Sequence, residues 1–284
     1  MEKWLIFAIL YAVFNGIYNC VKKKAIEKNT VYEVLAVLST LSFLLIATIT
    51  RDAFNMDFKY LWIIIVKSLV VALTWVFSLK AIKNLSVSVY SIIYLSNILF
   101  TIALSVLFLN ETITLTLLSG IIIIIIGLIL VNKISNKSGC KDARTKPIIL
   151  LLISCFFSAV SSIIDKVLLG YVSCGQLQFW YLLFLAVMFW VVLLCNKQKP
   201  KINAKELIKN YWIILLAGVL VIADKLFFMS AEIPESKMSI ITSVKQLAVI
   251  ETILLGKIMF KEKNIIKKLL CATLVIAGVV LTIL

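Results

Sequence analysis

The residues best suited to chemistry lie in the apolar segment 239–263. This segment is long enough to cross a bilayer, yet it contains Lys245, Gln246, Glu251 and Lys257. A charge near the middle of a spanning helix costs roughly 2.5–3.5 kcal/mol on insertion scales, so it persists only where it faces protein, a partner or water. Lys245 is central and cationic, which favours the binding of an anionic solute. Glu251 falls on a different helix face and is predicted to contact a neighbouring helix, and Lys257 is predicted to snorkel.

A second buried charge, Asp224, lies in the apolar segment 211–231. A short carboxylate cannot snorkel far, so it needs a partner. Two interpretations remain open: Asp224 neutralises Lys245 structurally, or it loads a proton in a coupling cycle. Lys67, in the segment 60–79, lies within reach of a helix end and is predicted to snorkel to the interface.

Uncharged polar residues form stripes on the same segments. In the segment 86–109 the stripe residues step i, i+4, i+7 and i+11, which is the spacing of one helix face; they are Tyr90, Tyr94, Asn97 and Thr101. Hydrogen bonds between helices, worth about 0.6 kcal/mol per pair, are the structural alternative. The candidate substrate-binding residues are Asn15, Asn19, Thr74, Tyr90, Tyr94, Asn97, Ser158, Ser162, Lys245 and Gln246, with Asp224 and Glu251 as coupling or charge partners.

The composition indicates an integral membrane protein. Of the 284 residues 62% are hydrophobic and only 15% are charged, which no soluble domain of this length matches. The chain has no histidine, and its six cysteines show no CxxC spacing. We therefore expect no catalytic triad, metal site, disulfide framework or cofactor. The net charge of +15 is concentrated in short gaps between apolar runs, a pattern of membrane orientation and not of nucleic-acid binding.

Ten apolar runs have the length that spans a hydrocarbon core. They predict an all-α protein of ten transmembrane helices at 4–21, 30–50, 60–79, 86–109, 112–132, 147–168, 177–195, 211–231, 238–260 and 265–284. The basic segment 133–146 is the natural hinge between two five-helix halves, residues 1–132 and 147–284.

The two halves are related by an internal duplication. With an offset of 151 positions, Ser88 falls over Ser239 and Glu111 over Glu262. The first spans match with an offset of 143, which places the stripe Tyr11, Asn15, Tyr18, Asn19, Lys22 and Lys23 over Ser154, Ser158, Ser161, Ser162, Asp165 and Lys166. Because each half has an odd number of spans, the second half is predicted to be inverted relative to the first, as in secondary transporters.

The charge distribution predicts the orientation in the membrane. Counting every gap, one side carries 20 lysines and arginines, among them Lys22, Lys23, Lys24 and Lys28, and the other side carries four. By the positive-inside rule the side with 20 is cytoplasmic, which leaves both termini outside.

Each half ends in an apolar span, a short acidic turn (LNETIT, FKEKNI) and a glycine-containing span (GIIIIIIGLILV, ATLVIAGVVLTI). Together with the ten spans in two halves, this pattern resembles the EamA-type branch of the drug/metabolite transporter superfamily, over essentially the whole chain. The resemblance implies alternating access to a central cavity lined by the first, third and fourth helices of each half. It also implies cytoplasmic termini, against the charge count. Glu111 and Glu262, in the acidic turns, are predicted to stabilise the N-termini of the helices that follow.

The sequence therefore predicts a secondary transporter of small polar metabolites in the cell membrane. An anionic or zwitterionic solute is favoured, such as an amino acid, an organic acid or a phosphorylated compound. No nucleotide-binding motif occurs, so an ion, proton or substrate gradient is the expected driver. A coupling ion and a homodimer are left open. The alternatives are an intramembrane enzyme on lipid-linked substrates, which would need a nucleophile–base cluster or paired carboxylates, and a scaffold, against which the buried polar stripes argue.

Overall fold

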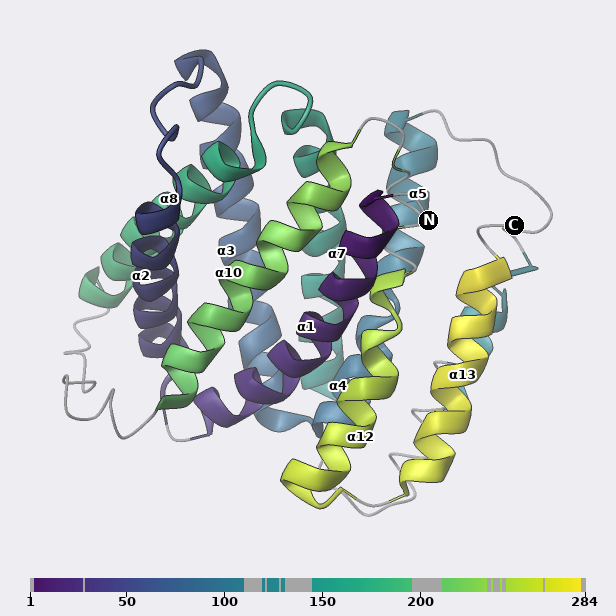
Figure 1. Ribbon diagram of the computed structural model, residues 1–284. Helices are drawn as coiled ribbons and strands as arrows, with labels where there is room; N and C mark the ends of the chain where they lie inside the picture. Colours follow the sequence, from purple (N-terminus) through teal and green to yellow (C-terminus); the bar gives the residue numbers. More distant parts are fainter. Residues whose placement is uncertain are drawn as a thin grey trace.

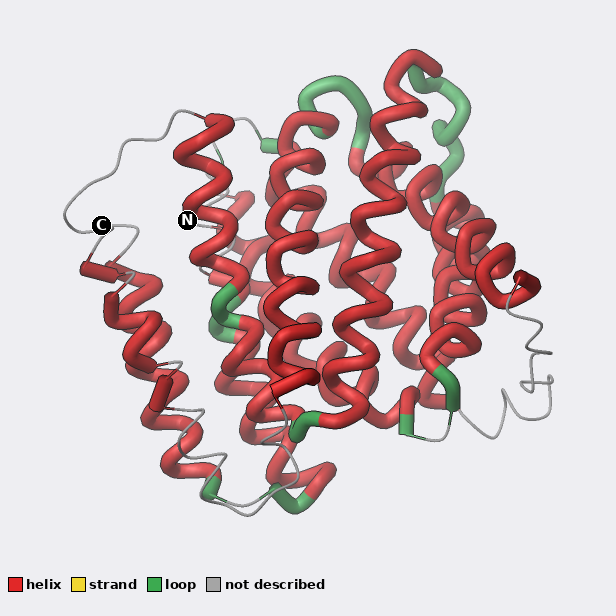
Figure 2. The backbone as a smooth tube through the Cα atoms, turned by 180° about the vertical axis from the view of Figure 1, so that it is seen from behind, coloured by secondary structure: helices red, strands yellow, loops and turns green. Residues whose placement is uncertain are grey.

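In the computed structural model the described residues form a bundle of helices joined by short connections (Figures 1 and 2). It describes residues 3–27, 29–109, 119–120, 122–127, 129–130, 145–195, 211–233, 236, 241, 244–262 and 264–281. No strand occurs among these residues. The helices are α1 (Lys3–Ile26), α2 (Val31–Ile49), η1 (Phe58–Tyr60), α3 (Leu61–Asn84), α4 (Val87–Tyr94), α5 (Asn97–Leu109), α7 (Thr145–Leu168), α8 (Cys174–Cys195), α10 (Tyr211–Glu232), α12 (Ala248–Phe260) and α13 (Ile265–Leu281).

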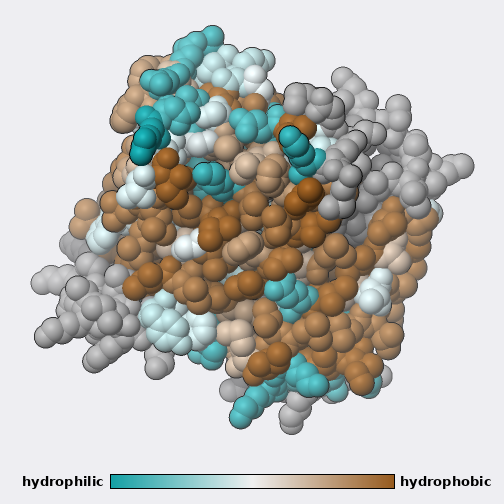
Figure 3. Space-filling model, in the orientation of Figure 1, coloured by the Kyte–Doolittle hydropathy of each residue, from teal (hydrophilic) through white to brown (hydrophobic). Residues whose placement is uncertain are grey.

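The helices form a membrane-embedded bundle. Within the described residues, seven helical segments are long and apolar enough to cross a bilayer, and they match predicted spans one to four and six to eight. Predicted spans nine and ten correspond to the shorter helices α12 and α13. About half of predicted span five is described, namely residues 119–120, 122–127 and 129–130, and these residues are helical. Figure 3 shows hydrophobic side chains across the middle of one face, with hydrophilic ones concentrated toward its upper and lower ends. The prediction of an all-α integral membrane protein is confirmed.

The two halves run in opposite directions. The third helices of the halves, α3 and α10, show this most clearly: in Figure 1, α3 runs downward and α10 runs upward. The halves also pack tightly against one another, because α1 lies along α10, α7 along α3, and α2 along α8. Aromatic pairs fill these contacts, with the ring centroids of Tyr11 and Phe227 at 5.3 Å and those of Phe43 and Phe179 at 5.2 Å.

Matching lysines bind carbonyl groups at the C-terminus of the third helix of each half. Lys23 Nζ donates to the carbonyls of Ile82 and Leu85, at 2.6 and 2.8 Å, where α3 ends. Its duplicate Lys166 donates to the carbonyls of Ala231 and Ser236, both at 3.0 Å, where α10 ends. These bonds satisfy carbonyls that a helix leaves unpaired at its C-terminus. They also correct the assignment of Lys22 and Lys23 to a loop, because α1 continues to Ile26 and carries both lysines into the bundle.

The fourth predicted span of each half is not one continuous helix. The first breaks between α4 and α5, where the amide of Leu95 bonds to the carbonyl of Ile92 at 3.2 Å in the tighter i→i−3 pattern. The second breaks before α12, where the amide of Leu247 bonds to the carbonyl of Val244 at 3.1 Å. The two breaks are related by the same 151-residue offset as the duplication. They place Tyr94 and Lys245 beside the interruption of their helices.

Glu262 stabilises a different helix from the one predicted. Its carboxylate accepts from the backbone amide of Val87 at 2.8 Å and from the hydroxyl of Ser88, at the N-terminus of α4. It also pairs with Lys268 at 2.7 Å. The acidic turn therefore joins the second half to the fourth helix of the first half, because that N-terminus lies beside it. Glu111 lies outside the described residues.

Replacing Glu262 by alanine should lower the free energy of unfolding by about 1–3 kcal/mol, since it leaves amides of α4 and the buried ammonium of Lys268 without their acceptor. Thermal unfolding of the purified protein measures this change. The matched control is Glu27→Ala, which removes an exposed pair with Lys24 and should cost less than about 1 kcal/mol. Equal effects of the two substitutions would contradict this role of Glu262.

Candidate functional site

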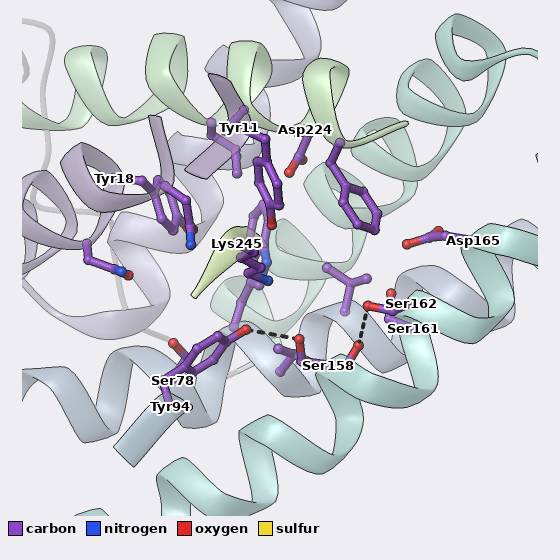
Figure 4. Close-up of a pocket in the computed structure, with 18 of the residues that line it drawn as sticks. Tyr11, Tyr18, Ser78, Tyr94, Ser158, Ser161, Ser162, Asp165, Asp224 and Lys245 are labelled. Atoms are coloured by element: carbon purple, nitrogen blue, oxygen red, sulfur yellow. Dashed lines mark hydrogen bonds between the residues drawn. The ribbon is translucent and has the colours of Figure 1, made fainter. Parts of the chain in front are cut away.

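A cavity of about 140 Å³ lies between the two halves and is lined by α1, α3, α4, α7, α8 and α10 together with Lys245 (Figure 4). The predicted polar stripes of several helices meet at this cavity. The predicted site residues that line the cavity are Asn15, Asn19, Thr74, Tyr90, Tyr94, Ser158, Ser162, Asp224 and Lys245.

Other predicted site residues lie elsewhere. Asn97 is buried and its side-chain amide donates to the carbonyl of Cys155 at 2.8 Å, so it joins α5 to α7 and does not line the cavity. Gln246 is buried in the break before α12, also outside the cavity lining. Glu251 packs against Gly16 of α1, where a Cβ atom would come within 2.8 Å of its carboxyl carbon. This neighbouring-helix contact agrees with the structural interpretation of Glu251.

Lys245 faces the cavity between two tyrosine rings. Its Nζ lies 5.5 Å from the ring centroid of Tyr11 and 5.4 Å from that of Tyr94. Figure 4 shows the hydroxyl of Tyr11 directed toward Lys245, with Asp224 beside the same ring. No carboxylate in the described part of the chain lies within ion-pair distance of Lys245, so the structure does not make Asp224 its permanent mate.

A second cation of the cavity, Lys22, is more deeply buried. Its side chain comes from α1, and its Nζ donates to the hydroxyls of Ser78 and Tyr90 at 2.8 and 2.9 Å. The rings of Tyr18 and Tyr90 lie 5.0 and 4.9 Å away. A cation–π contact is worth at most about 2 kcal/mol when desolvated. Removing an ammonium from water costs several kcal/mol, so these contacts compensate the charge of Lys22 only in part.

The third cation, Lys67, corrects the snorkelling prediction. Its side chain is 2% exposed, and its Nζ lies 3.1 Å from a carboxylate oxygen of Asp165 on α7. The ring centroid of Tyr181 is 3.7 Å from the same ammonium. The hydroxyl of Tyr181 in turn donates to Asp224. Lys67 stays inside because this buried carboxylate and aromatic ring replace the water that snorkelling would supply.

Hydrogen bonds hold the uncharged part of the lining. The hydroxyls of Tyr94 and Ser158 lie 3.0 Å apart, and Ser162 donates to the carbonyl of Ser158 at 3.0 Å (Figure 4). The hydroxyl of Ser154 donates to the carbonyl of Thr74 at 3.0 Å. Each of the contacts to Tyr94 and Thr74 crosses from one half to the other. No cluster of three or more possible metal ligands occurs in the described ranges.

The comparison with known families decides the identity of this architecture. The chain matches the EamA-like transporter family twice, over residues 2–133 and over residues 145–284. The chain belongs to the EamA-like transporter family. The membership expected from the acidic turns and the two halves is thereby confirmed, and transport by a multi-pass membrane protein is the activity of the family.

One curated protein and one solved structure are similar to this EamA-family chain. It is 33% identical over 140 residues to the Uncharacterized protein MJ1333.1 of Methanocaldococcus jannaschii, which covers 48% of the chain and 100% of the relative. That relative therefore matches a stretch about the length of one half. A solved crystal structure, described only as that of a protein, superposes with a TM-score of 0.67 at 10% identity, covering 96% of this chain and 95% of the other. At this identity the superposition shows the fold alone.

Several cavity residues of this EamA-family chain were missing from the candidate set, namely Tyr11, Tyr18, Lys22, Lys67, Ser78, Ser161, Asp165 and Tyr181. A signal existed for most of the α1 and α7 members, because they belong to the polar stripes that the duplication superimposes. Lys22 and Asp165 occupy matching stripe positions, yet Lys22 falls just after the predicted span 4–21 and was counted with the gap that follows it. For Tyr181 no polar periodicity was available, since α8 is apolar on most faces.

Thiol labelling tests which polar residues face the cavity. In a background without native cysteines, Thr74→Cys and Tyr94→Cys should react with a hydrophilic methanethiosulfonate, because both positions line the cavity. Asn97→Cys and Val275→Cys should stay unreactive, since both side chains are buried outside it. Mass spectrometry of the labelled protein measures the extent of reaction. Equal reactivity at the four positions would refute this assignment.

Proposed function

We propose that this protein is a secondary transporter that carries small polar metabolites across the cell membrane through the cavity between its inverted halves. The solute binds at the cavity and is released after the halves rearrange, by alternating access. A coupling proton or ion remains part of the proposal, with Asp224 as the group that would carry it. A homodimer is compatible with this function but is not required by it.

One observation carries the proposal: a polar cavity lies at the interface of two inverted repeats within an apolar bundle. Secondary transporters of this kind bind their substrates at a repeat interface, close to discontinuous helices. The paired breaks beside Tyr94 and Lys245 supply such discontinuities. A membrane scaffold needs no buried polar cavity. Nothing in the role of a scaffold requires both repeats to contribute polar residues to one cavity.

The intramembrane enzyme is less well supported. The cavity does bring two carboxylates together, those of Asp165 and Asp224. Each is held by its own partner, Asp165 by Lys67 and Asp224 by Tyr181. Among the described residues neither carboxylate is hydrogen-bonded to a serine, threonine or cysteine that it could activate as a nucleophile, so the transporter remains the function that the geometry favours.

Two native cysteines test the proposed orientation. Cys174 and Cys195 mark opposite ends of α8, and neither is fully buried. Because Cys195 precedes a lysine-rich gap, the charge count places it in the cytoplasm and Cys174 outside. A membrane-impermeant maleimide on intact cells should label Cys174 and spare Cys195, as read by peptide mass spectrometry. The reverse pattern would show that the termini are cytoplasmic, as in the usual family arrangement.

Solute flux tests the function itself. Purified protein in liposomes should accelerate the equilibration of at least one small labelled metabolite, drawn from amino acids, organic acids and phosphorylated compounds. Protein-free liposomes and liposomes with heat-denatured protein are the controls. Flux that never exceeds these controls for any solute of these three classes would contradict transport and favour the scaffold.

A further inference from the structure

The cavity holds two lysines whose ammonium groups flank one stacked pair of tyrosines. The rings of Tyr90 and Tyr94 stack with centroids 5.9 Å apart. Lys22 lies over the ring of Tyr90 at 4.9 Å, and Lys245 lies over the ring of Tyr94 at 5.4 Å. The two cations reach this stack from different halves of the chain. Both line the same cavity.

In the described part of the molecule, no carboxylate lies within ion-pair distance of Lys22 or Lys245. The carboxylates among the described lining residues are Asp165, which is bound to Lys67, and Asp224, which accepts from the hydroxyl of Tyr181. Two ammonium groups in a bundle interior, neither within ion-pair distance of a described carboxylate, indicate that an anion comes from outside the chain.

We infer that Lys22, Tyr90, Tyr94 and Lys245 form a subsite for the acidic group of a small organic anion. This inference rests on the proposed function and names its substrate class. The acidic group, a carboxylate or a phosphate monoester, is bound by an ammonium group of this subsite, and the two ammonium groups come from different halves of the chain.

The geometry also sets the size and charge of the solute. The cavity volume is about 140 Å³, which restricts the solute to a small molecule. With Lys67 and Asp165 neutralising one another, Lys22, Lys245 and Asp224 leave one positive charge in excess. A solute with a single net negative charge neutralises this excess. An organic cation adds to it and is excluded.

The wild-type protein tests the inference without any substitution. Each acid is paired with an uncharged analogue of similar shape: lactate with lactamide, succinate with succinamide, and glycerol 3-phosphate with glycerol. At matched ionic strength, at least one acid should raise the melting temperature by about 3 °C while its analogue and tetraethylammonium leave it unchanged. Comparing lactate and succinate with glycerol 3-phosphate separates carboxylate from phosphate recognition. The inference is overturned if no acid raises the melting temperature more than its uncharged analogue does.

Substitution of Lys22 locates the effect. Lys22→Gln should weaken binding of the stabilising acid at least about tenfold, and Lys22→Arg should retain most of it. The matched control Lys24→Gln, on the same helix but paired with Glu27, should bind like the wild type. Acid binding that is unaffected by Lys22→Gln overturns the subsite.

Flux in liposomes separates this inference from the proposed function. Flux of neutral or cationic solutes without acid-specific binding refutes the anion subsite and leaves the transporter standing. Acid-specific binding that depends on Lys22, without flux of any solute, supports the subsite and refutes transport.

Discussion

Replacing Lys67 by methionine is expected to lower the free energy of unfolding by about 3–5 kcal/mol, the cost of breaking a buried ion pair by removing one partner. The ammonium lies 3.1 Å from Asp165, and the two side chains are only 2% and 6% exposed. Methionine keeps most of the volume of lysine, so the loss comes from the stranded carboxylate and not from a void. Chemical or thermal unfolding of the purified protein measures it.

Two controls separate the buried pair from lysine substitution in general. The double variant Lys67→Met/Asp165→Leu should recover most of the lost stability, because no unpaired charge remains. Lys59→Met breaks the pair with Asp57 at 2.8 Å, whose side chains are 64% and 54% exposed, and should have no measurable effect. If the double variant is no more stable than Lys67→Met, the ion pair is not what the substitution disrupts.

Lys245→Gln is expected to abolish solute binding while the fold stays intact. The loss of one partner of a desolvated charge pair costs about 2–5 kcal/mol, which is at least about a 30-fold loss of affinity for an anion. The melting temperature should stay within about 2 °C of the wild type, since no carboxylate of the described chain depends on Lys245. Binding by thermal shift and flux in liposomes measure the two effects together.

The double variant with Asp224 decides between the two interpretations that the sequence left open. Asp224 accepts a hydrogen bond from the hydroxyl of Tyr181 and forms no ion pair with Lys245, so Asp224→Asn should not restore the function of Lys245→Gln. A destabilised Lys245→Gln that Asp224→Asn rescues would show a permanent structural pair. Lys257→Gln, an exposed change on α12, serves as the control and should leave binding unchanged.

Hydrophobic length and the internal duplication predicted the architecture because both are properties of the chain alone. The bilayer fixes how long an apolar run must be, and an odd number of spans forces inversion. The breaks in the fourth span of each half were not predictable in the same way. Leu95 and Leu247 are ordinary helix formers, and neither break contains proline or glycine. The local change to i→i−3 bonding therefore has no signal in residue type or in periodicity.

The candidate site residues that belong to a polar stripe were predictable from the sequence. Asn15, Thr74, Tyr94 and Ser158 converge because helical spacing determines which residues share a face. Partners were less predictable, because they depend on which helices meet. Lys67 has the same sequence context as a snorkelling lysine, and only the packing of α3 on α7 brings it to Asp165.

The central claim is that solute passes through the cavity between the halves, and one measurement tests it directly. Thr74→Cys, in a background without native cysteines, lines this cavity, whereas a cysteine at Leu194 is exposed at the end of α8 and outside it. Flux of the transported solute is measured in liposomes before and after complete reaction of each cysteine with a bulky hydrophilic methanethiosulfonate. The account predicts that modification at position 74 stops flux, that the solute slows this modification, and that modification at position 194 changes neither. Flux that continues at its full rate after complete modification of position 74 would contradict it.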